Sequence, residues 1–289
     1  PYPKRFEMKT ILLPTDFSNN AWNALFTALK IYDRQQCEFL ILNAYQPGVS
    51  HVLADRGEKQ LWALYEELKK ESEAKMAGVT GYLAKEYHNP HHRFRTRCRQ
   101  GEPTAVIREL LDSENIDGIV MGTQGATGAK RVFLGSNTVR VIRAVKNRPI
   151  LAVPQSYDLQ RLRKVIFPTD YLRAFQAYEL QPLLELVSDW KAKIHIVYAA
   201  AEFRLSPSQE AHKKQLEALL QQVSHKFEEI PLGRKVSRTL TRYSRESEAD
   251  LIALVHHRHP FFETLTREPV LKRVAFESEL PLLILPQLG

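Results

Sequence analysis

The sequence predicts two tandem α/β domains, each built on a parallel sheet with helices on both faces. The chain has 289 residues, which lies at the upper edge of what one hydrophobic core supports, about 250 to 300 residues. It also repeats itself, because residues 9–17, KTILLPTDF, recur as residues 163–171, RKVIFPTDY. Both halves close with an apolar run between two prolines, at residues 149–154 and 281–286. We therefore expect one domain over residues 1–156 and a second over residues 157–289.

The first copy alternates short apolar strands with helices. Ser18 is placed as the N-cap of a helix that runs to Ile31, and residues 57–85 carry apolar side chains at helical spacing. Residues 101–103 open a third helix, and Ser136 begins a fourth. Such an alternation predicts right-handed crossovers and a parallel sheet covered on both faces. Strands are expected near residues 9–14, 38–45, 93–99, 117–122 and 149–154.

Composition limits the class of protein without naming a ligand. The net charge is +8, which favours anionic ligands in general. No apolar run approaches the ~20 residues that a membrane-spanning helix needs, so a cytoplasmic location is expected. The two cysteines, Cys37 and Cys98, fall in apolar segments that are predicted to be strands, where a free thiol is commoner than a disulfide partner.

A ligand-binding site is expected at the carboxyl ends of the strands in the first copy, because ligands bind at this edge of open parallel sheets. The loop after the fourth strand reads Gly122-Thr123-Gln124-Gly125, nine further residues, and Gly135-Ser136. Glycines let backbone N–H groups approach a phosphate, and the start of a helix favours an anion. Neither a Gly-x-Gly-x-x-Gly turn after the first strand nor a P-loop is present. In the alternative interpretation, the glycines only form the turn into the fourth helix and no nucleotide binds.

This spacing, together with the strand-Pro-Thr-Asp start and the proline-bounded last strand, resembles the universal stress protein family in its tandem form. The resemblance spans nearly the whole chain. It implies a Rossmann-like fold of the adenine nucleotide alpha hydrolase type, with strand order 3-2-1-4-5 in each domain. It also implies that ATP or a related adenine nucleotide binds the first domain, with Mg²⁺ as a possible companion. The binding residues carried over by position are Pro14, Thr15, Asp16, Ala44, Met121, Gly122, Gln124, Gly125, Gly135, Ser136, Asn137 and Thr138.

The second copy keeps the scaffold and loses the glycines. Residues 255–258, Val-His-His-Arg, stand where the first copy has residues 122–125, and no glycine replaces Gly135. A nucleotide is therefore not expected there, although residues 168–170 repeat the Pro-Thr-Asp sequence. Residues 241–248 are polar and predict that a helix of the first copy is missing here.

Metal and nucleic-acid sites are disfavoured by the sequence. The histidines at positions 256, 257 and 259 have no cysteine beside them, and adjacent residues of a strand point to opposite sides. The alternating arginines 93, 95, 97 and 99 are expected to protect an edge strand. Without interleaved aromatic residues or a helix carrying clustered basic residues, nucleic-acid binding is not expected. His88, His91 and His92 are expected in a solvated loop.

The expected function is a stress-response protein that binds an adenine nucleotide and uses it to change its interactions, with slow hydrolysis or none. No catalytic residue is assigned, because a base or water-activating group with a clear partner is missing from the motif. The alternatives are an ATP hydrolase or adenylate-transferring enzyme of related fold, and an interaction module with an empty cleft. The resemblance also implies that the last strands of the two copies pair within the chain, and that two chains can form a homodimer.

Overall fold

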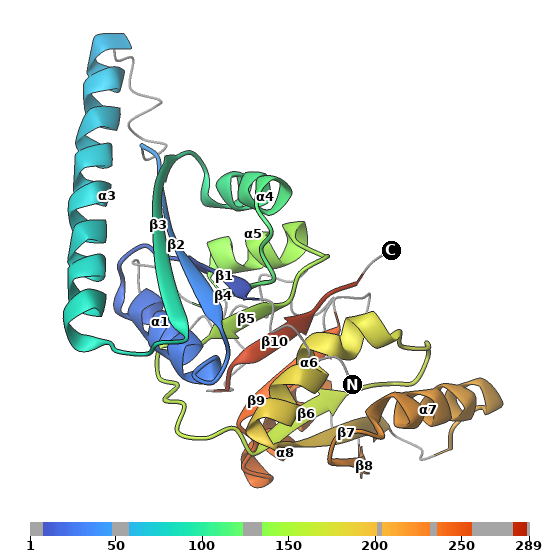
Figure 1. The fold of residues 1–289 in the computed structure, drawn as a ribbon. Helices are drawn as coiled ribbons and strands as arrows, with labels where there is room; N and C mark the ends of the chain where they lie inside the picture. The colour runs from blue at the N-terminus through green and yellow to red at the C-terminus, as the bar shows by residue number, and fades with distance from the viewer. Residues whose placement is uncertain are drawn as a thin grey trace.

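A computed structural model describes residues 8–47, 58–123, 135–200, 204–231, 236–255 and 280–287. In the first half, strands and helices alternate as the sequence predicts (Figure 1). The elements are β1 (Lys9–Pro14), α1 (Asn19–Ile31), β2 (Cys37–Tyr45), α3 (Glu58–Glu86), β3 (His92–Gln100), α4 (Pro103–Ser113), β4 (Gly118–Gly122), α5 (Ser136–Ala144) and β5 (Ile150–Val153).

The second half repeats this alternation in the described residues. Its elements are β6 (Lys164–Pro168), α6 (Ala177–Trp190), β7 (Lys193–Ala200), α7 (Pro207–Leu220), β8 (His225–Pro231), α8 (Val236–Glu246), β9 (Leu251–Val255) and β10 (Leu282–Leu285). Helices α6, α7 and α8 follow β6, β7 and β8, and such crossovers allow neighbouring strands of one half to pair in parallel.

The strands form one continuous sheet with the order β3-β2-β1-β4-β5-β10-β9-β6-β7-β8. Each half contributes five strands in the order 3-2-1-4-5, so the predicted fold class is confirmed. The pairs within each half are parallel. The centre differs, because β10 and β5 pair antiparallel, with Leu283 opposite Leu151.

Two hydrophobic clusters cover the two faces of the sheet. One cluster joins the sheet to α1, α3, α6 and α7. The other joins it to α4, α5 and α8. Every residue of the central strands β5 and β10 is buried. This three-layer arrangement leaves the ends of the strands as the places where loops gather (Figure 1).

The helix starts follow from local chemistry. Ser18 is extended, and its hydroxyl accepts a hydrogen bond from the Ala21 N–H, which satisfies one of the free donors at the start of α1. Glu102 does the same for α4 by accepting from the Ala105 N–H, with Pro103 at the first helical position. Both starts were predicted from these residue types.

The prediction of a missing helix in the second half is wrong. Helix α8 spans Val236–Glu246 and occupies the place that α4 has in the first half. Its buried side carries Thr239, Leu240 and Ser244, of which only Leu240 is aliphatic. The Ser244 hydroxyl donates to the Thr241 carbonyl within the helix, so these polar side chains can be buried. The sequence does carry apolar residues at helical spacing, at Val236, Leu240 and Tyr243. The prediction was wrong because it considered residues 241–248, which begin in the middle of α8 and are polar.

His92 does not lie in a solvated loop, which corrects a second prediction. It begins the edge strand β3 and is 8% exposed. Its Nδ1 atom lies 2.7 Å from the Tyr87 hydroxyl, and its Nε2 atom lies 2.9 Å from the Tyr32 carbonyl. The imidazole thereby connects the ends of α1 and α3. Burial lowers the pKa of His92 below its ordinary value.

We expect this burial to make stability depend on pH. Because the folded state favours neutral His92, its contribution is present above pH ~6.5 and is lost as the pH falls below that value. The pKa of His195 is lowered by burial too and acts in the same direction. Urea unfolding at pH 7.5 and pH 5.5 should therefore show the wild type losing more stability on acidification than His92→Gln. Equal losses in the two proteins would contradict this account.

Candidate functional site

The predicted site residues that the structure describes lie at the carboxyl edge of the first half of the sheet. Strand β1 pairs with β2 on one side and with β4 on the other, so the strand order reverses there. Leu12 lies opposite Ile119, and continuing this register by three residues brings Thr15 beside Gly122. Pro14 lies opposite Leu42, and continuing this register by two residues brings Asp16 beside Ala44. A reversal of strand order is the usual position of a ligand in such sheets.

The loop after β1 is held in one shape by its own side chains. The Thr15 hydroxyl accepts a hydrogen bond from the Phe17 N–H at 2.9 Å, and the Asp16 carboxylate accepts one from the Ser18 N–H at 3.0 Å. Phe17 has a φ of 63°, a conformation that is costly for a bulky residue and needs such support. Asp16 is exposed. The loop thus presents a fixed backbone at the expected base and ribose position.

Two residues that were not predicted hold this loop in place. The Asn43 side-chain amide, at the end of β2, donates to the Thr15 carbonyl at 2.7 Å. Its oxygen accepts from the Ser72 hydroxyl of α3, also at 2.7 Å. Both side chains are buried. The sequence offers one signal for this contact, because Ser72 is a polar residue on the stripe that continues with Met76 and Val79.

Gly122 is required by the packing of α1 against β4. A Cβ atom at this position would lie 2.7 Å from both Cγ and Oδ1 of Asn20, and 3.1 Å from its carbonyl oxygen. Asn20 cannot easily move aside, because its amide donates to the Val153 carbonyl at 2.9 Å. The glycine therefore serves the fold at this position, whatever else it does.

The start of α5 is tied directly to the end of β4. The Gly135 N–H donates to the Thr123 carbonyl at 2.5 Å, and the Thr138 hydroxyl donates to the Gly122 carbonyl at 2.9 Å. Gly135 is the N-cap of α5 and has no side chain to satisfy the first-turn N–H groups. Ser136 and Asn137 are exposed at this helix start. The first-turn N–H groups and the positive end of the helix dipole are suited to binding an anion.

Some predicted residues have other roles or lie outside the described structure. Thr138 is 3% exposed and binds the backbone, so it holds the turn together. Met121 is 6% exposed and packs in the core beneath α4 and α5. Gln124 and Gly125 lie outside the described residues, as do the histidines 256, 257 and 259.

Thr123 is a further residue that sequence reasoning missed. It follows Gly122 directly and is 1% exposed. Its hydroxyl oxygen has no hydrogen-bond partner among the described residues. A buried hydroxyl without a partner costs free energy, so such an atom beside a cluster of loops calls for a partner. It marks the place where β4 meets the turn into α5.

The matching edge of the second half is closed by side chains. Tyr171 and Tyr198 are 2% and 9% exposed, and their ring centroids lie 5.5 Å apart. Helix α7 covers this loop, because Gln209 donates to the Asp170 carbonyl and His212 lies 2.8 Å from the Tyr171 carbonyl oxygen. Tyr198 stands on β7 at the place that Asn43 has on β2. Aromatic packing thus replaces the polar support seen in the first half.

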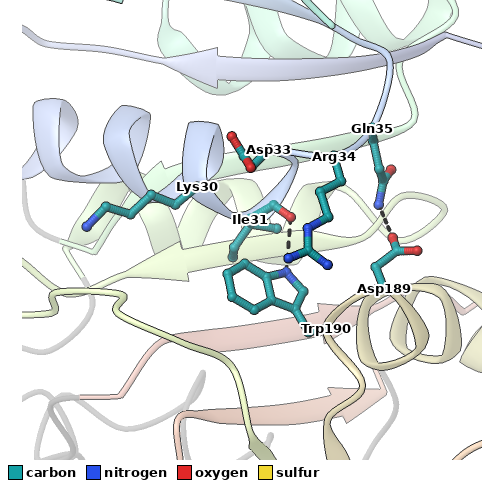
Figure 2. Close-up of a pocket in the computed structure, with 7 residues that line it drawn as sticks. All are labelled: Lys30, Ile31, Asp33, Arg34, Gln35, Asp189 and Trp190. Atoms are coloured by element: carbon teal, nitrogen blue, oxygen red, sulfur yellow. Dashed lines mark hydrogen bonds between the residues drawn. The ribbon is translucent and has the colours of Figure 1, made fainter.

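A small pocket of about 80 Å³ lies between the two halves, where β2 and β7 begin (Figure 2). The Trp190 indole N–H donates to the Ile31 carbonyl at 3.1 Å, and Gln35 donates to Asp189. The residues that line the pocket are Lys30, Ile31, Asp33, Arg34, Gln35, Asp189 and Trp190. The pocket lies at the strand ends opposite the candidate site, so it belongs to the contact between the halves.

Within the described residues, no helix is long and apolar enough to cross a membrane. In the same part of the chain, no three side chains of His, Cys, Asp or Glu are grouped to hold a metal ion.

Known proteins share both the sequence pattern and the fold. The model of the universal stress protein family matches residues 7–154. Universal stress protein MJ0531 of Methanocaldococcus jannaschii is 32% identical over 145 residues, which cover 50% of this chain and 81% of that protein. A universal stress protein of Thermus aquaticus is 30% identical over 145 residues, covering 50% of this chain and 98% of that protein.

The likeness in fold extends over both halves. The crystal structure of a universal stress protein from Archaeoglobus fulgidus has a TM-score of 0.69 at 17% identity. The comparison covers 98% of this chain and 97% of that one. Together with the match to the family model over residues 7–154, it leads to one conclusion: the chain belongs to the universal stress protein family.

Proposed function

We propose that the first half binds ATP or a related adenine nucleotide at the carboxyl edge of β1, β2 and β4, and that occupancy changes the protein's interactions. The observation that carries the proposal is the exposed start of α5 beside the end of β4. There Gly135 leaves first-turn N–H groups without a side-chain partner, and the spacing of Gly122, Gly125 and Gly135 matches the family's nucleotide motif.

The two ends of a nucleotide would meet different surroundings. The phosphates would lie at the positive start of α5, near Ser136 and Asn137, where backbone N–H groups can bind oxygen atoms. The base and ribose would lie against the fixed loop of Pro14, Thr15 and Asp16, beside Ala44. The Thr123 hydroxyl, which has no hydrogen-bond partner among the described residues, fits this reading, since a polar ligand next to Gly122 could complete its hydrogen bonding.

We further propose two domains, residues 1–156 and 157–289. Only the first domain would bind a nucleotide. The second carboxyl edge is filled by Tyr171 and Tyr198 and bridged by side chains of α7. Hydrolysis would be slow or absent. A general base must lie within hydrogen-bond reach of the attacking water, whereas Asp16 belongs to the loop expected at the ribose, where its carboxylate accepts from the Ser18 N–H.

Calorimetric titration with ATP, ADP, AMP and cyclic AMP tests this proposal. We expect one ligand per chain and weaker binding by adenosine than by ATP, because adenosine lacks the phosphates that the start of α5 would hold. No heat at millimolar concentrations of any of them would contradict the proposal and favour an interaction module with an empty cleft. In parallel, turnover of labelled ATP well above the buffer rate would favour the enzyme alternative.

A further inference from the structure

Helix α8 carries three arginines on one exposed side. Arg238, Arg242 and Arg245 are spaced by four and three residues, so they share one side of the helix. The opposite side, with Leu240, is buried against the sheet. We propose that this arginine stripe is a docking surface for the phosphate backbone of nucleic acid. The sequence alone disfavoured such binding because it did not reveal this helix.

The first half contains an internal comparison for the stripe. Asp117 and Asp250 play the same part in the two halves, each accepting from a backbone N–H at the start of β1 or β6. Aligning them matches α8 to α4 along their whole length of 11 residues each. The residues of α4 that correspond to the three arginines are Ala105, Glu109 and Asp112, all exposed. The three positions carry a total formal charge of +3 in the second half and −2 in the first half, so the fold does not require the arginines.

The arginines also do little to stabilise α8. Like charges three and four residues apart repel each other. Arg238 lies in the first turn, where the helix dipole disfavours a cation, and this offsets the favourable place of Arg245 in the last turn. The Glu246 carboxylate lies 3.9 Å from Arg242, but the two side chains are 67% and 61% exposed, and water screens such a pair. Because the arginine stripe contributes little to the stability of α8, a binding partner explains it better than a role in folding does.

Phosphate is the partner that fits this chemistry. One guanidinium group can donate two parallel hydrogen bonds to the oxygens of one phosphate. A nucleic-acid duplex presents one negative charge per ~1.7 Å of its axis, so every arginine of the stripe can have a phosphate within reach. Residues 234–245 contain five cations and no acidic residue. The exposed side of α8 offers no large apolar side chain in its described part, whereas a membrane-bound helix needs one to enter the lipid. An anionic membrane is therefore the poorer fit.

The test compares two triple variants of the full chain. One is Arg238→Gln, Arg242→Gln and Arg245→Gln. The matched control, Lys59→Gln, Lys69→Gln and Lys70→Gln, removes three exposed charges from α3 on the other face of the sheet. Thermal unfolding followed by circular dichroism establishes that both are folded. Binding is measured by fluorescence anisotropy of a labelled duplex of about 30 base pairs at salt concentrations from about 20 to 200 mM.

We expect the arginine variant to bind at least about tenfold more weakly at low salt, with a salt slope smaller by about 2.7, or 0.9 for each lost phosphate contact. The lysine control should keep the wild-type affinity within about twofold. Absence of wild-type binding, or an equal loss in the lysine control, would overturn the proposal. So would competition by polyglutamate or by phosphatidylserine vesicles as effective as that by unlabelled duplex.

Discussion

Replacing Gly122 by alanine is expected to lower the free energy of unfolding by about 1 to 3 kcal/mol, with or without nucleotide. The added Cβ atom would lie 2.7 Å from the Asn20 side chain and 3.1 Å from its carbonyl oxygen. Asn20 is 2% exposed and is fixed by its hydrogen bond to Val153. Either α1 moves away from β4 or a buried hydrogen bond weakens. Urea unfolding of the purified variant measures this loss directly.

Gly78 provides the matched control for this substitution. It lies within α3, and a Cβ atom there would have no neighbour within 4 Å. Gly78→Ala should raise the free energy of unfolding by about 0.5 to 1 kcal/mol, because alanine favours a helix over glycine. If Gly122→Ala were as well tolerated as Gly78→Ala, the close packing of α1 against β4 would be refuted. Gly122 variants are consequently poor probes of nucleotide binding.

Ser136→Asp is expected to weaken ATP binding by at least about tenfold while leaving the fold intact. A carboxylate in the first turn of α5 is favourable for the helix, by about 0.3 to 1 kcal/mol. The same negative charge repels the phosphates that this helix start would hold. Stability and binding should therefore change in opposite directions, which separates a lost ligand contact from a damaged fold. Calorimetry with ATP and thermal unfolding of the free protein measure the two effects.

Two controls define that result. Ser136→Ala removes the hydroxyl without adding charge and should change the affinity by less than Ser136→Asp does. Ser208→Asp places the same charge in the first turn of α7, in the second half, and should leave ATP binding unchanged. An unaltered ATP affinity in Ser136→Asp would show that the phosphates do not lie at the start of α5.

Much of the architecture could be predicted because it depends on local patterns. The strand-Pro-Thr-Asp repeat located β1 and β6, and capping residues such as Ser18 located helix starts. Helix α8 was not predicted because residues 241–248 are polar and begin in the middle of the helix, so the apolar spacing of Val236, Leu240 and Tyr243 was divided. Its buried side also includes Thr239 and Ser244. The burial of His92 was not predicted because its partners Tyr32 and Tyr87 become its neighbours only in the folded chain.

The candidate site was predictable in position but not in the roles of its residues. Glycine spacing identified the turn between β4 and α5, yet it could not show that Gly122 makes room for Asn20. It also could not show that Thr138 faces inward, or that Thr123 has a buried hydroxyl without a partner among the described residues. Such roles depend on which distant side chain approaches, and that follows from packing between elements.

The central claim, one adenine nucleotide at the carboxyl edge of the first half, is tested most directly by photolabelling. Irradiating the full chain with 8-azido-ATP, followed by mass spectrometry of its peptides, reports where the base lies. The proposed site predicts label in peptides containing Thr15, Ala44 or Gly122, and its loss when excess ATP is present. Label concentrated in residues 157–289, or label that excess ATP does not remove, would contradict it.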